Sequence, residues 1–197
     1  MTRLIGAVLV VLGALAVAAP LRAADYVEKQ TGVAFPDTIG KFMREGVHEL
    51  PDRRLGVAIR YYVRKLAKAD IFVYDLGMAG IGTGVASPLV RSQFEQMQRD
   101  VFRIQDRGDY VGVTLLGETG ANELPRVGAL SLLHARFSYA EKSAAGTVGP
   151  KLMSHAYITG FRGALFKLRI TYPAALEDQG QKLTAEFLEG LRPVLEP

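Results

Sequence analysis

The clearest pattern of hydrophobic and polar positions along the chain is helical and covers residues 87–107. Large apolar side chains recur there within an arc of about 80°, at 100° per residue. They are Val90, Phe94, Met97, Val101 and Ile104. Ser87 suits the N-cap, Pro88 the first helical position, and Gly108 the left-handed residue that ends a helix. The segment therefore predicts an amphipathic helix whose apolar stripe packs on a broad surface, such as a sheet.

Strand patterns lie on both sides of this helix. Residues 55–64 alternate strictly, with Val57, Ile59 and Tyr61 on one face, and we expect helix 87–107 to cover that face. Residues 71–74 are apolar on both faces, which predicts a central strand. Further strands are expected over 42–50, 111–115 and 129–139, and a hairpin over 152–159 and 165–172.

The chain closes with a second helical pattern over 175–191, in which Leu176, Leu183, Phe187 and Leu191 recur on one side. We expect Gly180 to weaken its middle and Pro193 to stop it. Strands, a helix, more strands and a closing helix predict an α+β fold, a mainly antiparallel sheet flanked by two main helices. The helices could share one face of the sheet or lie on opposite faces. The two-sided apolarity of residues 71–74 favours a sandwich-like arrangement.

The first 24 residues have the pattern of a targeting segment. Arg3 precedes an uncharged apolar run over 4–19, and small residues follow at Ala23 and Ala24. We predict a signal peptide over 1–24 that is cleaved near Ala23 or Ala24, a single α+β domain over 25–197, and a periplasmic or secreted location. The alternative is an uncleaved N-terminal anchor.

Charge and cysteine content narrow the class of protein. The chain has 24 basic and 20 acidic residues. Because Arg3 and Arg22 would leave with the targeting segment, 22 basic and 20 acidic residues would remain. Such a small excess gives no reason to expect nucleic-acid binding. The chain has no Cys, so an exported form has no disulfide and depends on its core for stability.

The candidate binding segment is a glycine-rich loop over 77–84 that follows the strand ending at Tyr74 and Asp75. The candidate residues are Tyr74, Asp75, Gly77, Met78, Gly80, Ile81, Gly82 and Gly84. A phosphate-binding loop is one interpretation, but the segment lacks a Gly-Lys-Ser/Thr ending and Gly-x-Gly-x-x-Gly spacing. A mobile surface loop is another. A third is a contact loop for another envelope protein or a membrane surface, because its apolar Met78 and Ile81 are expected to be exposed.

Single residues give little sign of catalysis or metal binding. His48, His134 and His155 lack metal-ligand spacing, and no Gly-x-Ser-x-Gly elbow is present. We therefore expect no catalytic residues, no metal and no cofactor, and we interpret His134 and His155 as solvent-side or hydrogen-bonded structural residues. Asp75 either binds a ligand or caps a turn, and the turn is favoured.

Basic residues alternate with apolar ones in the later strands. They could form a basic sheet face or be solvated positions paired with acids, and the second is favoured. The residues are Lys167, Arg169, Arg60, Arg64 and Arg136.

Over residues 32–195 the layout resembles the PsbP, Mog1 and DcrB-like group of small α/β sandwich proteins. The resemblance rests on the order of elements, on Phe35-Pro36 near the mature start, on the helix after a central hairpin, and on the strand from Phe166 to Tyr172 before the terminal helix. Members of this group are often exported or serve as accessory subunits. The resemblance implies a non-catalytic periplasmic role.

These observations favour an exported, non-catalytic accessory or binding protein of the bacterial envelope. The first alternative is an enzyme whose site is assembled from distant strands, which a buried pocket with several titratable groups would indicate. The second is an envelope protein held by its uncleaved N-terminus.

Overall fold

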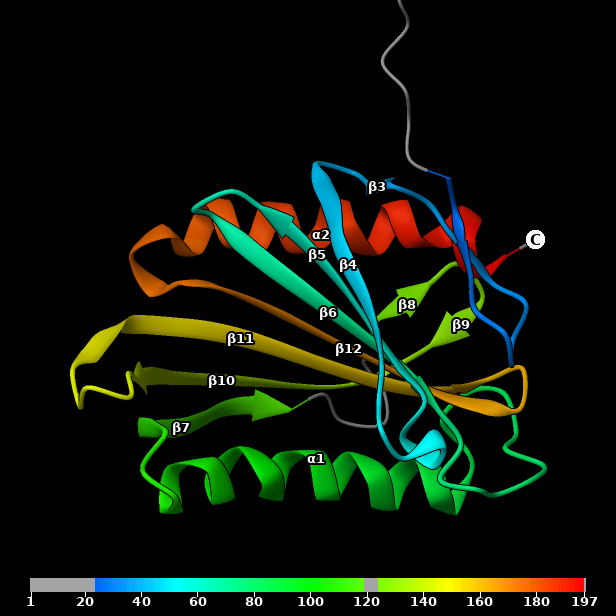
Figure 1. Cartoon of the computed structure of the whole chain (residues 1–197), viewed down its shortest axis with the longest axis horizontal. Helices are drawn as coiled ribbons and strands as arrows, with labels where there is room; N and C mark the ends of the chain where they lie inside the picture. Colours follow the sequence, from blue (N-terminus) through cyan, green and yellow to red (C-terminus); the bar gives the residue numbers. More distant parts are fainter. Residues whose placement is uncertain (1–23, 119–123, 197) are drawn as a thin grey trace, which may run out of the picture.

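The structure, a computed structural model, describes residues 24–118 and 124–196, and one eight-stranded antiparallel sheet dominates it (Figure 1). The strand order is β3-β4-β5-β6-β12-β11-β10-β7. The strands are β3 (Thr38–Ile39), β4 (Phe42–Glu49), β5 (Val57–Val63), β6 (Ala67–Tyr74), β7 (Tyr110–Glu118), β10 (Leu133–Lys142), β11 (Val148–Phe161) and β12 (Ala164–Pro173). The predicted targeting segment lies outside the described residues, apart from Ala24.

Smaller elements complete the chain. The short strands β1 (Tyr26–Val27) and β2 (Ala34–Phe35) pair with each other, as do β8 (Arg126–Val127) and β9 (Leu130–Ser131). Two single 3-10 turns, η1 (Arg53–Leu55) and η2 (Ala174–Leu176), precede β5 and the last helix. Leu55, predicted to begin a strand, therefore belongs to a turn.

Helix α1 (Pro88–Asp106) confirms the first sequence pattern almost to the residue. Ser87 is its N-cap, Pro88 begins it, and Gly108 follows its end with φ of 84°. Four of the five predicted stripe residues are buried, and Ile104 is half-buried. The helix forms where the pattern predicts because its first residues, its apolar stripe and the glycine after its end are all signals within the segment itself.

Helix α2 (Glu177–Leu195) confirms the second pattern but extends past its predicted end. Pro193 lies inside the helix and does not stop it. A proline removes one backbone N–H and disturbs the preceding turn. The helix continues because Leu191 and Leu195, one turn apart, are both buried against the core.

The two helices cover opposite faces of the sheet, one below and one above it in Figure 1. Phe187 of α2 makes edge-to-face contacts with Phe42 and Tyr61, with ring centroids 4.8 Å and 5.7 Å apart. Phe94 of α1 belongs to a separate core with Phe137 of β10. The α+β sandwich is thus confirmed.

The prediction that α1 covers the first face of residues 55–64 is wrong. Val57, Ile59 and Tyr61 pack in the core beneath α2. Periodicity shows which side chains of a strand share a face, but it does not show which distant helix reaches that face.

The hairpin of β11 and β12 is the longest pairing in the sheet and turns at Arg162 and Gly163. Both residues have positive φ, of 48° and 79°, and Phe161 pairs directly with Ala164. This is the two-residue connection that matches the twist of antiparallel strands. It fixes which residues of β12 face each helix.

The sheet edge at β7 is irregular. Its register with β10 shifts twice, and the N–H of Val113 donates to Oε1 of Gln105 in α1 at 2.7 Å. Bulges and a capped donor make an edge a poor template for pairing with another strand.

Within the described residues, no helix is both long and apolar enough to span a membrane.

Candidate functional site

The glycine-rich loop lies across the turn end of the β11–β12 hairpin. Gly84 and Gly160 exchange two backbone hydrogen bonds, of 2.8 Å and 3.1 Å, and Ile81 forms a bridge with Gly163. A β-carbon on Gly160 would overlap the carbonyl oxygen of Gly82, so only glycine permits this approach. The loop is therefore tied to the sheet at two points.

Ile81 and Met78 behave differently, and the expectation that both are exposed is wrong for one of them. Ile81 is 5% exposed and packs with Tyr74 and Val90, whereas Met78 is 48% exposed. The bridge to Gly163 turns Ile81 inward. Sequence could not show this, because Gly163 is far away along the chain.

Tyr74 and Asp75 at the end of β6 have structural partners. Burial raises the pKa of Tyr74 to about 12, and Asp100 adds to the effect. Oδ1 of Asp75 accepts from the N–H of Gly77 at 2.7 Å, and its Oδ2 accepts from Nε2 of Gln30 at 3.2 Å. The interpretation of Asp75 as a turn cap is confirmed.

Four segments meet at this end of the sheet: residues 28–33, 49–56, 74–84 and 160–163. We call it the glycine-loop end. The N–H of Leu76 donates to the carbonyl of Arg54 at 2.8 Å, and Nη1 of Arg162 donates to the carbonyl of Thr31 at 3.2 Å. Gln30 also reaches the carbonyl of Gly163, at 3.4 Å. Hydrogen bonds thus join the four segments into one surface.

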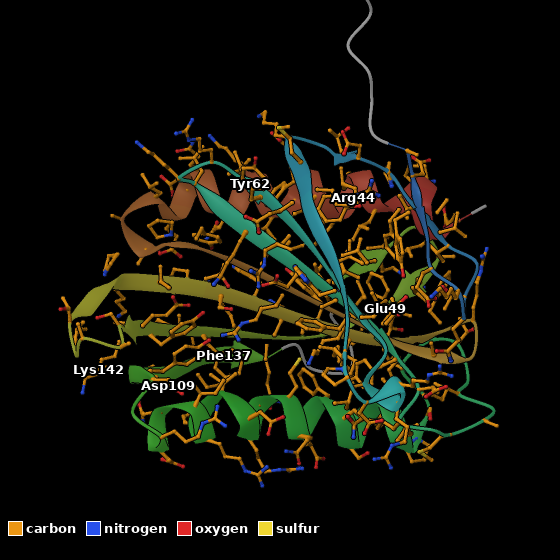
Figure 2. All side chains as sticks on the ribbon, in the orientation of Figure 1. Arg44, Glu49, Tyr62, Asp109, Phe137 and Lys142 are labelled. Atoms are coloured by element: carbon orange, nitrogen blue, oxygen red, sulfur yellow. The ribbon has the colours of Figure 1, made fainter. Side chains whose placement is uncertain are left out.

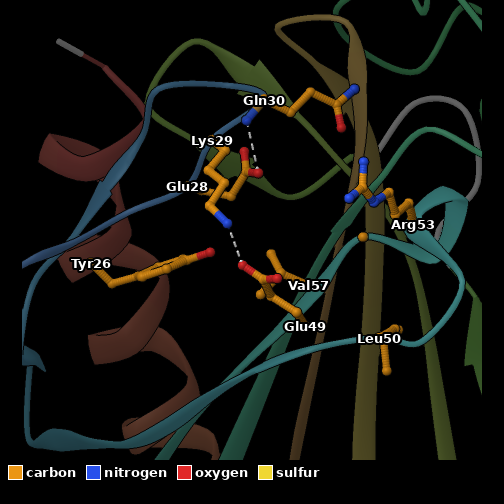
Figure 3. A pocket seen from close by; sticks show the side chains of 9 residues that line it. Tyr26, Glu28, Lys29, Gln30, Glu49, Leu50, Arg53 and Val57 are labelled. Atoms are coloured by element: carbon orange, nitrogen blue, oxygen red, sulfur yellow. Dashed lines mark hydrogen bonds and ion pairs between the residues drawn. The ribbon is translucent and has the colours of Figure 1, made fainter.

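An open cavity of about 330 Å³ lies beside the glycine-loop end (Figure 3). Tyr26, Leu50 and Val57 provide apolar parts of its wall. Lys29 and Glu49 form an ion pair of 2.6 Å across it, which raises the pKa of Lys29 and lowers that of Glu49. Such mixed walls suit a protein side chain or peptide better than a uniformly charged ligand.

A second cavity, of about 170 Å³, lies between α1 and the sheet. Its charged lining residues come from α1, β6 and β12, and they are Asp70, Asp100, Lys167 and Arg169. Asp70 forms an ion pair of 2.6 Å with Arg60, and Asp100 one of 3.3 Å with Arg103. Both acids therefore have an arginine partner, although the pair of Asp100 with Arg103 is exposed at the surface.

The two bases of this cavity interact with aromatic rings. Nζ of Lys167 lies 4.5 Å from the ring centre of Phe72. Nε of Arg169 donates to Oγ of Ser154 at 2.9 Å, and its guanidinium lies over Tyr139 and Tyr110. Burial lowers the pKa of Lys167, Arg169 lowers it further, and Asp100 opposes the change.

The prediction of solvated basic residues paired with acids is right for some members of the set. Arg60 pairs with Asp70, and Arg136 pairs with Glu177 at 3.2 Å on the α2 side of the sheet. Lys167 and Arg169 instead lie half-buried under α1. Since Arg136 lies on the opposite face, these residues do not form one basic sheet face.

His134 and His155 are brought together by the pairing of β10 with β11. Nε2 of His134 and Nδ1 of His155 share a hydrogen bond of 3.0 Å, and Nε2 of His155 shares one of 2.9 Å with the hydroxyl of Tyr172. His134 also stacks on Tyr157 with ring centres 4.4 Å apart. This confirms the interpretation of both histidines as hydrogen-bonded structural residues.

Burial favours the neutral form of both imidazoles. It lowers the pKa of His134 to about 4, with Arg136 contributing, and that of His155 to about 3, with His134 and Arg136 contributing. In the described part of the chain, no third His, Cys, Asp or Glu joins the pair to form a set that could hold a metal ion.

Comparison with known proteins adds information about the fold. No family model matches the chain, and no match is found among curated proteins. The solution structure of cyanobacterial PsbP (CyanoP) from Synechocystis sp. PCC 6803 aligns with a TM-score of 0.51 and 12% identity, over 90% of this chain and 98% of that one. The chain has a PsbP-like fold. A crystal structure of a Pseudomonas aeruginosa protein of unknown function aligns over 80% of this chain and 88% of that one, with a TM-score of 0.35 and 11% identity.

The PsbP-like fold confirms the resemblance seen in the order of elements. Sequence reasoning missed the cavity beneath α1, although one signal was present. Asp70, Lys167 and Arg169 are charged residues inside strands with many apolar neighbours. Charges at such positions indicate a partly buried polar site when a helix covers that face.

Proposed function

We propose that this protein is an exported, non-catalytic accessory protein of the bacterial envelope that binds a partner protein at its glycine-loop end. The observation that carries the proposal is the exposure of Met78 and Leu55, at 48% and 44%, on two segments joined by the Leu76–Arg54 hydrogen bond. Large apolar side chains exposed on two joined segments of an ordered surface favour association with another protein.

The backbone around Met78 is already ordered. Asp75 caps the turn before it through the N–H of Gly77, and the Gly84–Gly160 hydrogen bonds hold the far end of the loop. A preorganised surface loses less conformational entropy when a partner binds. The loop is thus better suited to recognition than a loop without such anchors.

Charge favours a protein partner over a membrane surface. The four segments of the glycine-loop end contain as many basic as acidic residues. The bases are Lys29, Arg53, Arg54 and Arg162, and the acids are Glu28, Glu49, Asp52 and Asp75. Binding to anionic lipid needs a basic excess, whereas protein interfaces carry mixed charge around an apolar centre.

Two further observations support export and an accessory role. The first 24 residues have the n-region, apolar run and small residues of a signal peptide. The PsbP-like fold agrees with the accessory role that the resemblance to the PsbP group implies. Fold likeness alone assigns no activity, so the proposal depends on the exposed surface.

The alternative that the protein is an enzyme is supported by the cavity beneath α1, because several titratable groups line it. Among the described residues that line it, none is Ser, Thr, Cys or His. Its acids are already paired with Arg60 and Arg103. A binding role explains this set of side chains better than acid-base or nucleophilic catalysis does.

Crosslinking in intact cells, followed by capture of the protein, tests the proposal. We expect Met78→Ser to lose a partner protein that the parent captures. Met43→Ser is the matched control, because Met43 is also exposed but lies at the far end of β4 from Glu49. Equal recovery of every crosslinked protein by the parent and both variants would contradict the proposed surface.

A further inference from the structure

We propose that the cavity between α1 and the sheet binds a small organic carboxylate, held by Lys167 and Arg169. The inference goes beyond the proposed function, because it concerns a small molecule on the α1 side of the sheet and does not depend on the glycine-loop end. It rests on the charge balance, the walls and the size of the cavity.

Neither of the two positive groups that line the cavity, Lys167 and Arg169, forms an ion pair with an acid among the described residues. Asp70 and Asp100 each have an arginine partner outside the cavity lining, at 2.6 Å and 3.3 Å. No ion pair within residues 24–118 and 124–196 includes Lys167 or Arg169. One bound anion would therefore give these two bases an ion-pair partner inside the cavity.

The hydrogen-bond donors that Arg169 and Lys167 leave unused among the described residues also favour a bound carboxylate. Nη2 of Arg169 is buried, and no group of the described chain accepts a hydrogen bond from it. Nζ of Lys167 has aromatic faces, those of Phe72 and Tyr74, as its contacts. A carboxylate provides two acceptor oxygens, and buried donors are normally paired with an acceptor.

The remaining walls favour an organic anion over an inorganic one. Phe72, Met97, Val101, Ile104 and Ala156 provide apolar surface in the same cavity. A volume of about 170 Å³ is smaller than the ~300–1,000 Å³ of pockets for drug-sized molecules. The ligand class is thus a short carboxylate with an apolar tail, and a nucleotide is excluded by size.

Butyrate is a suitable probe, with chloride and inorganic phosphate at the same ionic strength as controls. We expect butyrate to raise the unfolding temperature of the purified parent protein saturably, with one site by calorimetry. Lys167→Met should weaken this binding at least tenfold. Lys151→Met removes one positive charge from an exposed position of β11 and should leave binding unchanged.

A measurement on the parent protein alone avoids dependence on the folding of any variant. NMR titration of the Lys167 side chain should show its pKa rising when butyrate saturates the protein, since a bound anion stabilises the ammonium form. An unchanged Lys167 titration, equal butyrate binding by Lys167→Met, or equally strong saturable binding of phosphate would overturn the proposal.

Discussion

Tyr172 of β12 occupies the space into which a β-carbon on Gly180 of α2 would extend. The helix approaches the strand so closely here that a methyl group would overlap the tyrosine ring. Tyr172 is fully buried and hydrogen-bonded to His155, so the ring has little freedom to move away. Gly180, expected from sequence to weaken the helix, also permits this close contact between helix and sheet.

Gly180→Ala should therefore destabilise the protein, although alanine is the better helix former by ~0.5–1 kcal/mol. We expect a net loss of about 1–3 kcal/mol in the free energy of unfolding, because overpacking a buried contact outweighs propensity. Denaturant unfolding measures this. Gly82→Ala, where a β-carbon meets nothing within 4 Å, is the control. A stabilised Gly180→Ala variant would contradict the close packing.

The stripe of α1 gives a second stability prediction. Phe94→Asp should cost more than ~3 kcal/mol, because it places an unpaired charge in the core that also contains Phe137. Arg99→Ala should cost under ~0.5 kcal/mol, since Arg99 is exposed and its ion pair with Glu95 is at the surface. Similar denaturation midpoints for the two variants would show that the buried face is assigned wrongly.

Met78 and Ile81 separate binding from stability within one loop. Ile81→Ser should lower the free energy of unfolding by about 2–4 kcal/mol, because Ile81 is a buried part of the α1 core. Met78→Ser should change it by less than ~0.5 kcal/mol. Thermal and denaturant unfolding of the two variants check this difference, and comparable losses would mean that the loop is packed throughout.

Stability should fall as the pH drops from about 6.5, the ordinary pKa of an unfolded histidine, toward 4. His134 and His155 have lowered pKa values of about 4 and about 3 in the folded protein, so the unfolded chain binds more protons over this range. Each histidine removes at most ~1.4 kcal/mol per pH unit, and half-buried His134 less.

Unfolding measured between pH 7 and pH 5 tests this pH dependence. We expect His155→Gln to show a shallower decline than the parent protein. The exposed His48 of β4 provides the control His48→Gln, which should follow the parent. If His155→Gln lost stability with falling pH as steeply as the parent protein, His155 would not be the buried neutral group that causes the decline.

Processing gives a prediction about the N-terminus. The exported protein should begin near Ala24 or Asp25, because small residues at Ala23 and Ala24 follow the apolar run. Intact mass and N-terminal sequencing of protein recovered from the envelope measure this directly. Retention of Met1 in that fraction would instead support an N-terminal anchor.

Local signals predicted much of this fold, and contacts between distant segments account for what was missed. The boundaries of α1 follow from Pro88 and Gly108, which are local signals, whereas the side chain of the N-cap residue Ser87 makes no capping hydrogen bond within the described chain. The end of α2 does not follow from Pro193, because burial of Leu195 in the core decides it. The types of neighbouring residues predict helices and strands well, but which helix packs on which strand depends on the arrangement of the whole sheet.

The candidate site shows the same division. Asp75 and Gly77 are close in sequence, so their turn could be predicted. Ile81 is buried by a bridge to Gly163, and Lys167 is covered by a helix from another part of the chain. Neither relationship leaves a periodic signal in the local sequence. Charged residues inside strands signal a polar site, but only the three-dimensional structure shows that α1 and the sheet enclose it as a cavity.

The pairing of β6 with β12 joins the first half of the chain to its C-terminal part. Strands β3 to β6 gain their next neighbour only from β12, and the helix that covers their apolar face, α2, follows β12. An incomplete chain thus exposes both an open strand edge and an uncovered core. We therefore expect strands β3 to β6 to reach their stable packing only after the C-terminal segment with β12 and α2 is available.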